Sequence, residues 1–402
     1  MAGADTILVT HPGRQHSHRA ALALAHGGRL AGYWAGVPSL ESHAHGVPTA
    51  LWRRLVRYHP VELPVDLVRW APWVPALRRL SGAALPAGLA SRADFAACRL
   101  YDRWVARRLA GTACGAVIAC EISALASFRE AKRLGRIAIL DAPSFHHAAQ
   151  DRLHGFGEPP ALHRAIVQVK NAEIALADHI VTVSELARET YLAAGVAPTR
   201  VHAVALGADL ELFRATSAPS AAAPFRFLFC GARSKRKAFD VLVEAFLGVV
   251  REEPRALLRL VGPSGDAGDL AGRLPSANVS LSGPLPQEEL AREFAQAHCV
   301  VLASRNDSYG MVVAEALAAG CPVLVSDQVG AKELVAEGGN GWIVPAGDVA
   351  ALRERMLFCV RHTEAVIGLR EACRRSAARA TWESYEERLL ALLARLVPRA
   401  SA

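Results

Sequence analysis

Short apolar runs alternate with longer segments of helical periodicity along the whole 402-residue chain. The runs are rich in β-branched side chains and are bounded by Gly, Pro, Asp or Ser, which is typical of strands buried on both faces. Predicted strands begin at Thr6, Ala116, Ile137, His179, Arg200, Phe225, Leu257, Cys299 and Pro322. Strands separated by helical segments predict parallel sheets with helices on both faces, an α/β fold.

The length of the chain favours two domains, because a single hydrophobic core stops growing at roughly 250–300 residues. The clearest compositional break is the Ala-, Ser- and Pro-rich stretch from Thr216 to Pro224. We therefore predict an N-terminal domain over 1–214, a linker over 215–224, a C-terminal domain over 225–375 and a final helical segment over 376–402. Ligands of open α/β sheets bind beyond the carboxyl ends of the strands, so we expect the site in a cleft between the domains.

Eight cysteines are scattered along the chain, at positions 98, 114, 120, 230, 299, 321, 359 and 373. They form no Cys-x-x-Cys pair and no Cys/His pair at metal-ligand spacing, which argues against a zinc site and against a disulfide framework. The N-terminus lacks a basic segment followed by an apolar one, and no apolar run reaches about 18 residues. We therefore expect reduced thiols, no signal peptide, no membrane-spanning helix and a cytoplasmic location.

Positive charge is concentrated between residues 51 and 110. This segment holds eleven Arg against four acidic residues, a surplus of seven out of the net charge of +8, together with Trp52, Trp70, Trp73 and Trp104. Arg and Trp on amphipathic segments suit an anionic surface at the inner face of a membrane, or an acidic acceptor; a solvated helical face with inward-packed Trp is the alternative. No nucleic-acid-binding motif accompanies the charge, so nucleic acid is not an expected partner.

Two strand-to-helix loops in the C-terminal half suggest a site. After the run at 225–230, Gly231 allows a tight turn. Four cations then precede a helical pattern: Arg233, Lys235, Arg236 and Lys237. A helix N-terminus adds partial positive charge at this point, so the loop suits a diphosphate, with a solvated basic loop as the alternative.

The second loop reads D-S-Y-G-M-V-V-A-E from Asp307 to Glu315. The helix that begins at about Gly310 directs unpaired N–H groups back into the predicted cleft. Glu315 lies within an otherwise apolar helix, where an unpartnered carboxylate is costly. The vicinal hydroxyls of a ribose would supply two donors, and a structural salt bridge is the alternative.

With these motifs the C-terminal half resembles a family 4 glycosyltransferase of the GT-B fold, in the glycosyl transferases group 1. The loop from Gly231 to Ala238 matches the family's basic G…R/K…K-G loop, and Asp307 to Glu315 matches its E-x7-E motif. Weaker similarities in the same order occur at residues 171–190, 205–213, 281–290 and 381–390. The resemblance implies two Rossmann-like, doubly wound domains facing a central cleft, with a C-terminal helix that returns to the N-terminal domain.

The resemblance also implies roles for individual residues. It assigns Lys237, with Arg233 or Arg236, to the nucleotide diphosphate, and Glu315 to the ribose. Asp307 would face the donor sugar, so Asp307 and Lys237 are expected close to the reacting bond.

Further donor contacts follow from the same resemblance. Gly231 shapes the phosphate loop, Gly310 and Met311 would offer backbone N–H groups to the phosphate or the sugar, and Gly262 would line the base pocket. Two positions depart from the family pattern: Asp307 stands where the family has Glu, and Ala238 where it has Gly. The sugar preference and the shape of the basic loop therefore stay open.

On the acceptor side, the first strand runs into H-P-G-R-Q-H-S-H. The resemblance implies that this loop, which begins at Gly13, closes over the donor phosphates. Arg14, Gln15 and His16, with His18, would then face the acceptor, and an exposed capped loop is the alternative.

Two further histidines, His146 and His147, follow the predicted strand at 137–141. The family often keeps a His near the donor sugar after this strand, and His146 is the expected catalytic residue. A pair of histidines in a polar surface loop is the alternative.

The resemblance implies retaining transfer of a hexosyl-type group from a nucleotide-diphosphate sugar to a hydroxyl of a carbohydrate or glycolipid acceptor, as in polysaccharide assembly. The chain has no D-x-D triplet, so no metal and no other cofactor is expected, and the departing phosphate can itself take the acceptor proton. Two alternatives stay open: a sugar-nucleotide epimerase of the same fold, and a non-catalytic membrane-surface or assembly protein that keeps the cleft.

Overall fold

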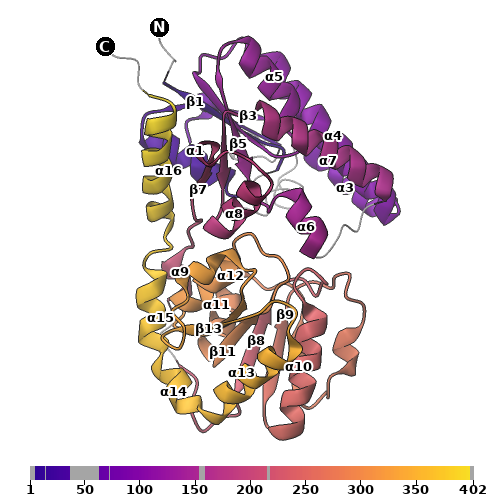
Figure 1. Cartoon of the computed structure of the whole chain (residues 1–402), viewed down its shortest axis with the longest axis vertical. Helices are drawn as coiled ribbons and strands as arrows, with labels where there is room; N and C mark the ends of the chain where they lie inside the picture. Colours follow the sequence, from indigo (N-terminus) through magenta and orange to yellow (C-terminus); the bar gives the residue numbers. More distant parts are fainter. Residues whose placement is uncertain are drawn as a thin grey trace.

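The computed structural model describes residues 5–13, 15–36, 63–71, 73–153, 159–214 and 218–398. Within these residues, two parallel sheets covered by helices form two α/β domains, one above the other (Figure 1). The predicted α/β class and the two doubly wound sheets are confirmed.

The first sheet has seven strands in the order β3-β2-β1-β4-β5-β6-β7. They are β1 (Ile7–His11), β2 (Leu30–Ala35), β3 (Val68–Trp70), β4 (Ala116–Cys120), β5 (Ile137–Ala142), β6 (His179–Thr182) and β7 (Val201–Ala203). Its helices are α1 (Ser17–His26), α3 (Trp73–Ala84), α4 (Ala87–Leu109), α5 (Leu125–Arg133), α6 (His147–Leu153), α7 (Pro160–Leu176) and α8 (Glu185–Ala193). The strand order reverses between β1 and β4, which is where doubly wound sheets bind ligands.

The second sheet has six strands in the order β10-β9-β8-β11-β12-β13. They are β8 (Arg226–Cys230), β9 (Leu257–Val261), β10 (Val279–Ser282), β11 (Cys299–Leu302), β12 (Val323–Ser326) and β13 (Gly341–Val344). The α-helices that follow β7 are α9 (Leu210–Phe213), α10 (Phe239–Glu252), α11 (Gln287–Gln296), α12 (Met311–Ala318), α13 (Val349–Arg361), α14 (Thr363–Gly368), α15 (Arg370–Ala377) and α16 (Trp382–Leu396). Here the order reverses between β8 and β11, so the basic loop and the Asp307–Glu315 motif follow the two strands at this switch point.

Each apolar run predicted as a strand corresponds to one of β1, β4 to β9, β11 and β12. The sequence pattern did not single out β2, β3, β10 and β13. β2 and β13 contain Gly, and β3 is three residues long. β10 lies at the sheet edge and has no fully buried residue, so it lacks the apolar run that marks an interior strand.

The second core shows how strand alternation builds the two layers. Phe227 and Phe229 on β8 pack toward α10, where they meet Phe246 and Phe239. The intervening Leu228 belongs to the other layer, with α11 and α12. Full burial of a Phe side chain contributes about 1.5–3 kcal/mol relative to exposure, so these aromatic contacts anchor α10 and the loop before it.

The chain crosses between the domains twice, and the two crossings lie side by side. The Ala208 N–H donates to the Ala380 carbonyl at 2.8 Å, and a Cβ on Gly207 would lie 2.4 Å from backbone atoms of Thr381. Helix α16 then runs along α1 of the first domain (Figure 1), where His26 Nδ1 lies 3.1 Å from Glu386 Oε2. The expected return of the C-terminal helix is confirmed.

Helix α9 packs on α11 and α12 of the second domain, although it precedes the predicted linker. Residues 215–217 of that linker lie outside the described residues. The boundaries at 214, 225 and 375 stay predictions.

Candidate active site

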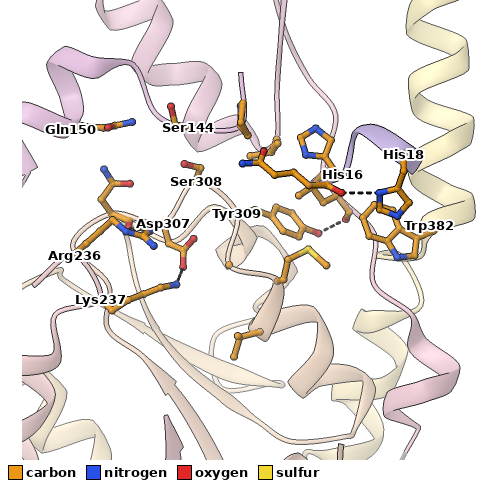
Figure 2. Close-up of a pocket in the computed structure, with 18 residues that line it drawn as sticks. His16, His18, Ser144, Gln150, Arg236, Lys237, Asp307, Ser308, Tyr309 and Trp382 are labelled. Carbon is orange, nitrogen blue, oxygen red and sulfur yellow. Dashed lines mark hydrogen bonds and ion pairs between the residues drawn. The ribbon is translucent and has the colours of Figure 1, made fainter. Parts of the chain in front are cut away.

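A cleft of about 680 Å³ lies between the two domains, beyond the carboxyl ends of the strands (Figure 2). Its lining combines the loop after β1, the loop after β5, the basic loop after β8, the loop and helix after β11, and the start of α16. The lining residues are Gln15, His16, His18, Pro143, Ser144, Gln150, Val183, Leu206, Arg236, Lys237, Asn306, Asp307, Ser308, Tyr309, Gly310, Met311, Val312 and Trp382.

The basic loop is held close to β9 by glycines. A Cβ on Gly262 would lie 2.3 Å from the carbonyl oxygen of Gly231, so only glycine fits there. Arg233 donates to the Gly262 carbonyl at 3.0 Å and to Ser264 Oγ at 2.8 Å. The shape of the loop behind the cleft therefore depends on Gly231, Arg233 and Gly262. These residues do not line the cleft.

Lys237 and Asp307 form an ion pair at the edge of the cleft, next to Arg236 (Figure 2). Their side chains are 13% and 11% exposed, so the ammonium group is largely desolvated but still borders the cavity. The exposed Arg236 lies beside them and donates to the Asn306 carbonyl at 3.1 Å. These two cations face the expected position of an anion, and Asp307 holds one of them in place.

Ala238, which stands where the family pattern has Gly, adopts a left-handed conformation with φ = 51°. It is fully buried and directly precedes α10. The backbone at residue 238 thus keeps the left-handed conformation that glycine favours. The Cβ of Ala238 makes this conformation strained.

The N-terminus of α12 is directed into the cleft. Gly310 has φ = 88°, and a Cβ there would lie 2.8 Å from Val329 Cγ1, so this turn requires glycine. Met311 and Val312, the first residues of the helix, line the cavity. Because the first N–H groups of a helix lack intrahelical partners, this end offers donors and partial positive charge to an anion.

Glu315 lies one turn further along α12 and does not line the main cavity. Its charge raises the pKa of Cys230, at the end of β8, in addition to a larger effect of burial, so the carboxylate lies near the second switch point. Among the described residues no hydrogen bond or ion pair reaches the Glu315 carboxylate, and burial raises its pKa to about 7. An unpartnered carboxylate of this kind gains from hydroxyl donors.

The loop after β1 forms the opposite wall. His16 Nε2 lies 3.0 Å from Asp141 Oδ1, at the end of β5. Burial lowers the pKa of His16, but the charge and hydrogen bond of Asp141 outweigh burial, so the pKa is raised above its ordinary 6.5. Gln15 and His18 also line the cavity, with His18 Nδ1 2.8 Å from the Gln15 carbonyl oxygen.

Two residues predicted on this side do not line the cleft or cannot be placed. The Gly13 N–H donates to Nδ1 of the buried His11 at 2.8 Å, and Gly13 lies outside the lining. Arg14 lies outside the described residues.

His146 is buried and does not line the cleft. Its ring packs 5.2 Å from that of Tyr191 and 4.1 Å from that of His147, and burial lowers its pKa to about 4. Ser144 and Gln150, on either side of it in sequence, line the cavity instead. The chain after β5 thus directs the His146 ring into the first domain and the side chains of Ser144 and Gln150 toward the cleft.

Several lining residues were not predicted from the sequence. Tyr309 donates to the Leu206 carbonyl at 2.5 Å, which joins the second domain to the first. Trp382, on the first turn of α16, lies beneath the Arg19 guanidinium at 5.0 Å and borders the cleft from the crossover (Figure 2). Both lie in segments that resemble the family, Asp307–Glu315 and 381–390, but neither was assigned a role, because each takes its position from contacts with the other domain.

In the part of the chain that the structure describes, no group of three or more His, Cys, Asp and Glu side chains could hold a metal ion. No described helix is both long and apolar enough to cross a membrane.

Residues 224–362 match the family model described as Glycosyl transferases group 1. Curated relatives include D-inositol 3-phosphate glycosyltransferase 1 of Catenulispora acidiphila, 30% identical over 257 residues, which are 59% of this chain and 62% of the relative. The D-inositol 3-phosphate glycosyltransferase of Thermobispora bispora is 33% identical over 238 residues, 53% of this chain and 55% of the relative. The chain thus matches somewhat more than half the length of each of these proteins.

Solved structures resemble nearly the whole chain. Sucrose-phosphate synthase of Thermosynechococcus elongatus superimposes with a TM-score of 0.67 and 18% identity, over 98% of this chain and 99% of that one. HepE of Anabaena, solved with UDP, superimposes with a TM-score of 0.65 and 16% identity, over 97% and 100%. At these identities the likeness shows the fold, and the GT-B architecture is confirmed.

Proposed function

We infer that this chain, whose residues 224–362 match the family model described as Glycosyl transferases group 1, transfers a sugar from a nucleotide-diphosphate sugar to an acceptor hydroxyl. One observation carries the proposal: a single cleft brings a desolvated lysine and a helix N-terminus from one domain opposite the polar side chains of Gln15, His16 and His18 from the other. A diphosphate leaving group needs its developing negative charge stabilised, and fixed cations and helix dipoles do this in a site that excludes water.

The donor half of the proposal rests on the second domain. Lys237 and Arg236 would contact the diphosphate, with the N–H groups of Gly310 and Met311 completing the anion site. Glu315 would accept hydrogen bonds from the ribose hydroxyls, which explains a buried carboxylate without a protein partner. The structural relative HepE was solved with UDP and with UDP-glucose, which makes UDP a reasonable first nucleotide to test.

At the donor sugar, Asp307 would hold both Lys237 and a sugar hydroxyl. The geometry favours Ser144 and Gln150 over His146 as the polar contacts from the first domain, because they border the cavity and His146 does not. We propose that His146 instead supports the loop after β5 by packing on Tyr191.

The acceptor would enter between Gln15, His16 and His18 on one side and Trp382 on the other. Hydrogen-bonding side chains beside an aromatic face suit a hydroxyl-rich carbohydrate or the sugar end of a glycolipid. The curated relatives are named for D-inositol 3-phosphate, a hydroxyl-rich ring, and we propose an acceptor of that general class. Retention of configuration is proposed from the family, and the anomeric proton coupling of the product would test it.

A membrane surface is the proposed partner for the helices α3 and α4. Leu77, Leu80, Leu85, Leu89 and Leu100 are all more than two fifths exposed on this hairpin. Exposed arginines lie on the same helices, at positions 79, 92, 103, 107 and 108. Apolar side chains among cations favour an anionic lipid surface.

Vesicle sedimentation tests this docking. Protein should pellet with vesicles of phosphatidylglycerol and phosphatidylcholine, and the double variant Leu77→Gln with Leu80→Gln should pellet much less. Leu281→Gln, on the exposed edge strand of the other domain, is the matched control. Equal sedimentation of both variants would remove this surface from the proposal. Arg53, Arg54 and Arg57, which belong to the Arg-rich segment 51–110, lie outside the described residues.

The function itself is tested in two steps. A thermal-shift screen with UDP, GDP, ADP and CMP and their sugar conjugates identifies the donor, because a ligand that binds only the native state raises its melting temperature. Mass spectrometry of reactions with the selected donor and candidate acceptors then detects transfer. Conversion of the donor into its epimer without an acceptor would favour the isomerase alternative, and absence of any nucleotide binding by folded protein would favour a non-catalytic role.

A further inference from the structure

A polar network in the first domain fixes the hydroxyl of Ser144, which borders the cleft. Ser144 Oγ donates to Oε1 of Glu121, the residue that follows β4. Lys170, on α7, contacts the other carboxylate oxygen of Glu121 at 3.0 Å and donates to Ser144 Oγ at 3.4 Å. The side chains of Glu121 and Lys170 are 11% and 8% exposed, so this ion pair is largely withdrawn from solvent.

The partners of Ser144 decide the direction of each hydrogen bond. A carboxylate only accepts, so the serine hydrogen is directed to Glu121. An ammonium group only donates, so Lys170 uses one of the two lone pairs of Oγ. Among the described residues no further hydrogen bond reaches Ser144, which leaves one lone pair of Oγ for a ligand. Ser144 is therefore presented to the cleft as an acceptor and not as a donor.

The backbone around Ser144 is held as firmly as its hydroxyl. The next residue, Phe145, is fully buried and packs with Ala149 and Ala187. Its carbonyl accepts from Gln150 Nε2 at 2.7 Å. A hydroxyl that is already oriented before the ligand arrives loses little conformational freedom on binding, so its hydrogen bond contributes more fully to affinity.

Ser144 lies in the part of the first domain that faces the donor motif. It follows β5, which is the neighbour of β6 in the sheet. Ser184, directly after β6, donates to the Ser308 carbonyl at 2.6 Å. Ser308 in turn follows Asp307, the partner of Lys237. Figure 2 shows Ser144 across the cleft from Asp307, so the hydroxyl borders the half of the cleft in which the donor sugar is proposed to lie.

We propose that Ser144, held as an acceptor by Glu121 and Lys170, determines sugar specificity by accepting a hydrogen bond from one hydroxyl of the donor sugar. The proposal deepens the transferase function above and rests on it. A sugar that lacks this hydroxyl, or carries a group there that cannot donate, leaves the Ser144 lone pair unpaired in the closed site. Sites built to bond a hydroxyl reject such analogues for this reason.

Isothermal titration with UDP-glucose, or with the conjugate that the thermal-shift screen selects, tests the acceptor role. The comparison ligands are UDP and the analogues in which each sugar hydroxyl in turn is replaced by hydrogen or by fluorine, which cannot donate. At one position, both analogues should bind wild type roughly 3- to 10-fold more weakly than the parent, as expected for one hydrogen bond. Ser144→Ala should abolish this difference at that position alone, and it should bind UDP like wild type.

Glu121→Gln tests the direction of the bond. Its side-chain amide can donate to Ser144 Oγ, which frees the serine hydrogen to turn toward the ligand. At the contacted position the fluorinated analogue should then bind better than the deoxy one. A merely structural role of Glu121 would instead weaken all the analogues alike. Ser280→Ala, on the exposed edge strand β10, is the matched control and should keep the preferences of wild type.

Two results would overturn the assignment: fluorinated analogues that match the parent sugar at every position, or a Ser144→Ala protein with the same preferences as wild type. Either would leave the proposed function standing, because the nucleotide sugar still binds. If Glu121→Gln does not fold, the Ser144→Ala titrations decide. Wild-type protein that binds no nucleotide sugar would refute the proposed function, and the role of Ser144 with it.

Discussion

Glu315 gives the sharpest test of the donor site, because its protonation should control nucleotide affinity. Burial raises the pKa of its carboxyl from 4.5 to about 7. Ribose hydroxyls that donate to the carboxylate favour its ionised form, so below pH 7 binding must first remove a proton. At pH 6 this removal costs about 1.4 kcal/mol, and a nucleoside diphosphate should bind roughly tenfold more weakly than at pH 8.

The variant Glu315→Gln removes the charge and keeps the shape of the side chain. At pH 8 it should lose about 1.5–3 kcal/mol of binding free energy, a factor of roughly 10 to 150, as expected for hydrogen bonds to a charged group. At pH 6 the wild-type carboxyl is mostly protonated, so the two proteins should bind more nearly alike. Glu289→Gln, exposed on α11, is the control and should bind like wild type.

Isothermal titration with UDP, or with whichever diphosphate the thermal-shift screen selects, measures both effects. Titrations at pH 6, 7 and 8 in two buffers of different ionisation enthalpy also count the protons released. The ligand phosphates titrate in the same range, but they do so with both proteins, so the difference between wild type and Glu315→Gln isolates the carboxyl. Equal affinities at pH 8, or an identical pH dependence, would refute the placing of the ribose on Glu315.

Three other substitutions test separate parts of the molecule. Lys237→Ala should weaken diphosphate binding by about 1.5–3 kcal/mol in the same titrations, whereas the exposed Lys235→Ala should not, and equal losses would indicate only a general effect of charge. Ala238→Gly should change the free energy of unfolding in urea by less than about 1 kcal/mol. Relief of the left-handed strain offsets both the loss of the buried methyl group and the larger entropy of the unfolded chain. Ala238→Val should be clearly destabilising. Glu173→Ala should lower that free energy by at least about 3 kcal/mol, since the buried carboxylate accepts three backbone N–H groups at the start of α5 and each orphaned group costs about 1–3 kcal/mol. An unchanged urea midpoint for Glu173→Ala would contradict the importance of these bonds.

The sequence predicted the fold and several residues that border the cleft, because both depend on the order of residues along the chain. Interior strands need apolar runs, and the loops that follow the strands at a switch point border the cleft. Lys237, Asp307 and Gly310 follow β8 and β11 directly, so their position along the chain placed them at the site. The same logic failed for β10, which lies at an edge and does not need an apolar run.

The other residues at the cleft take their positions from side-chain directions and from packing between the domains. The local sequence around each residue predicts neither. Arg233 belongs to the basic loop, but its guanidinium turns back to the Gly262 carbonyl. His146 follows β5 as expected, yet its ring fills a space beside Tyr191. Trp382 reaches the cleft only because α16 returns across the hinge, so no neighbouring residue in the sequence indicates its role.

The return of α16 also affects how the protein is made. The first domain is completed by a helix that leaves the ribosome after the whole second domain, because α1 packs on α16. Until those residues emerge, the face of α1 that carries His26 and lies beside Gly27 stays open to solvent, while the second domain can already fold as a unit. A nascent chain arrested before α16 should therefore protect the second sheet from proteolysis well before the first. Loss of α16 would then remove Trp382 from the cleft lining and leave α1 without its partner helix, although every residue of the N-terminal sheet is present.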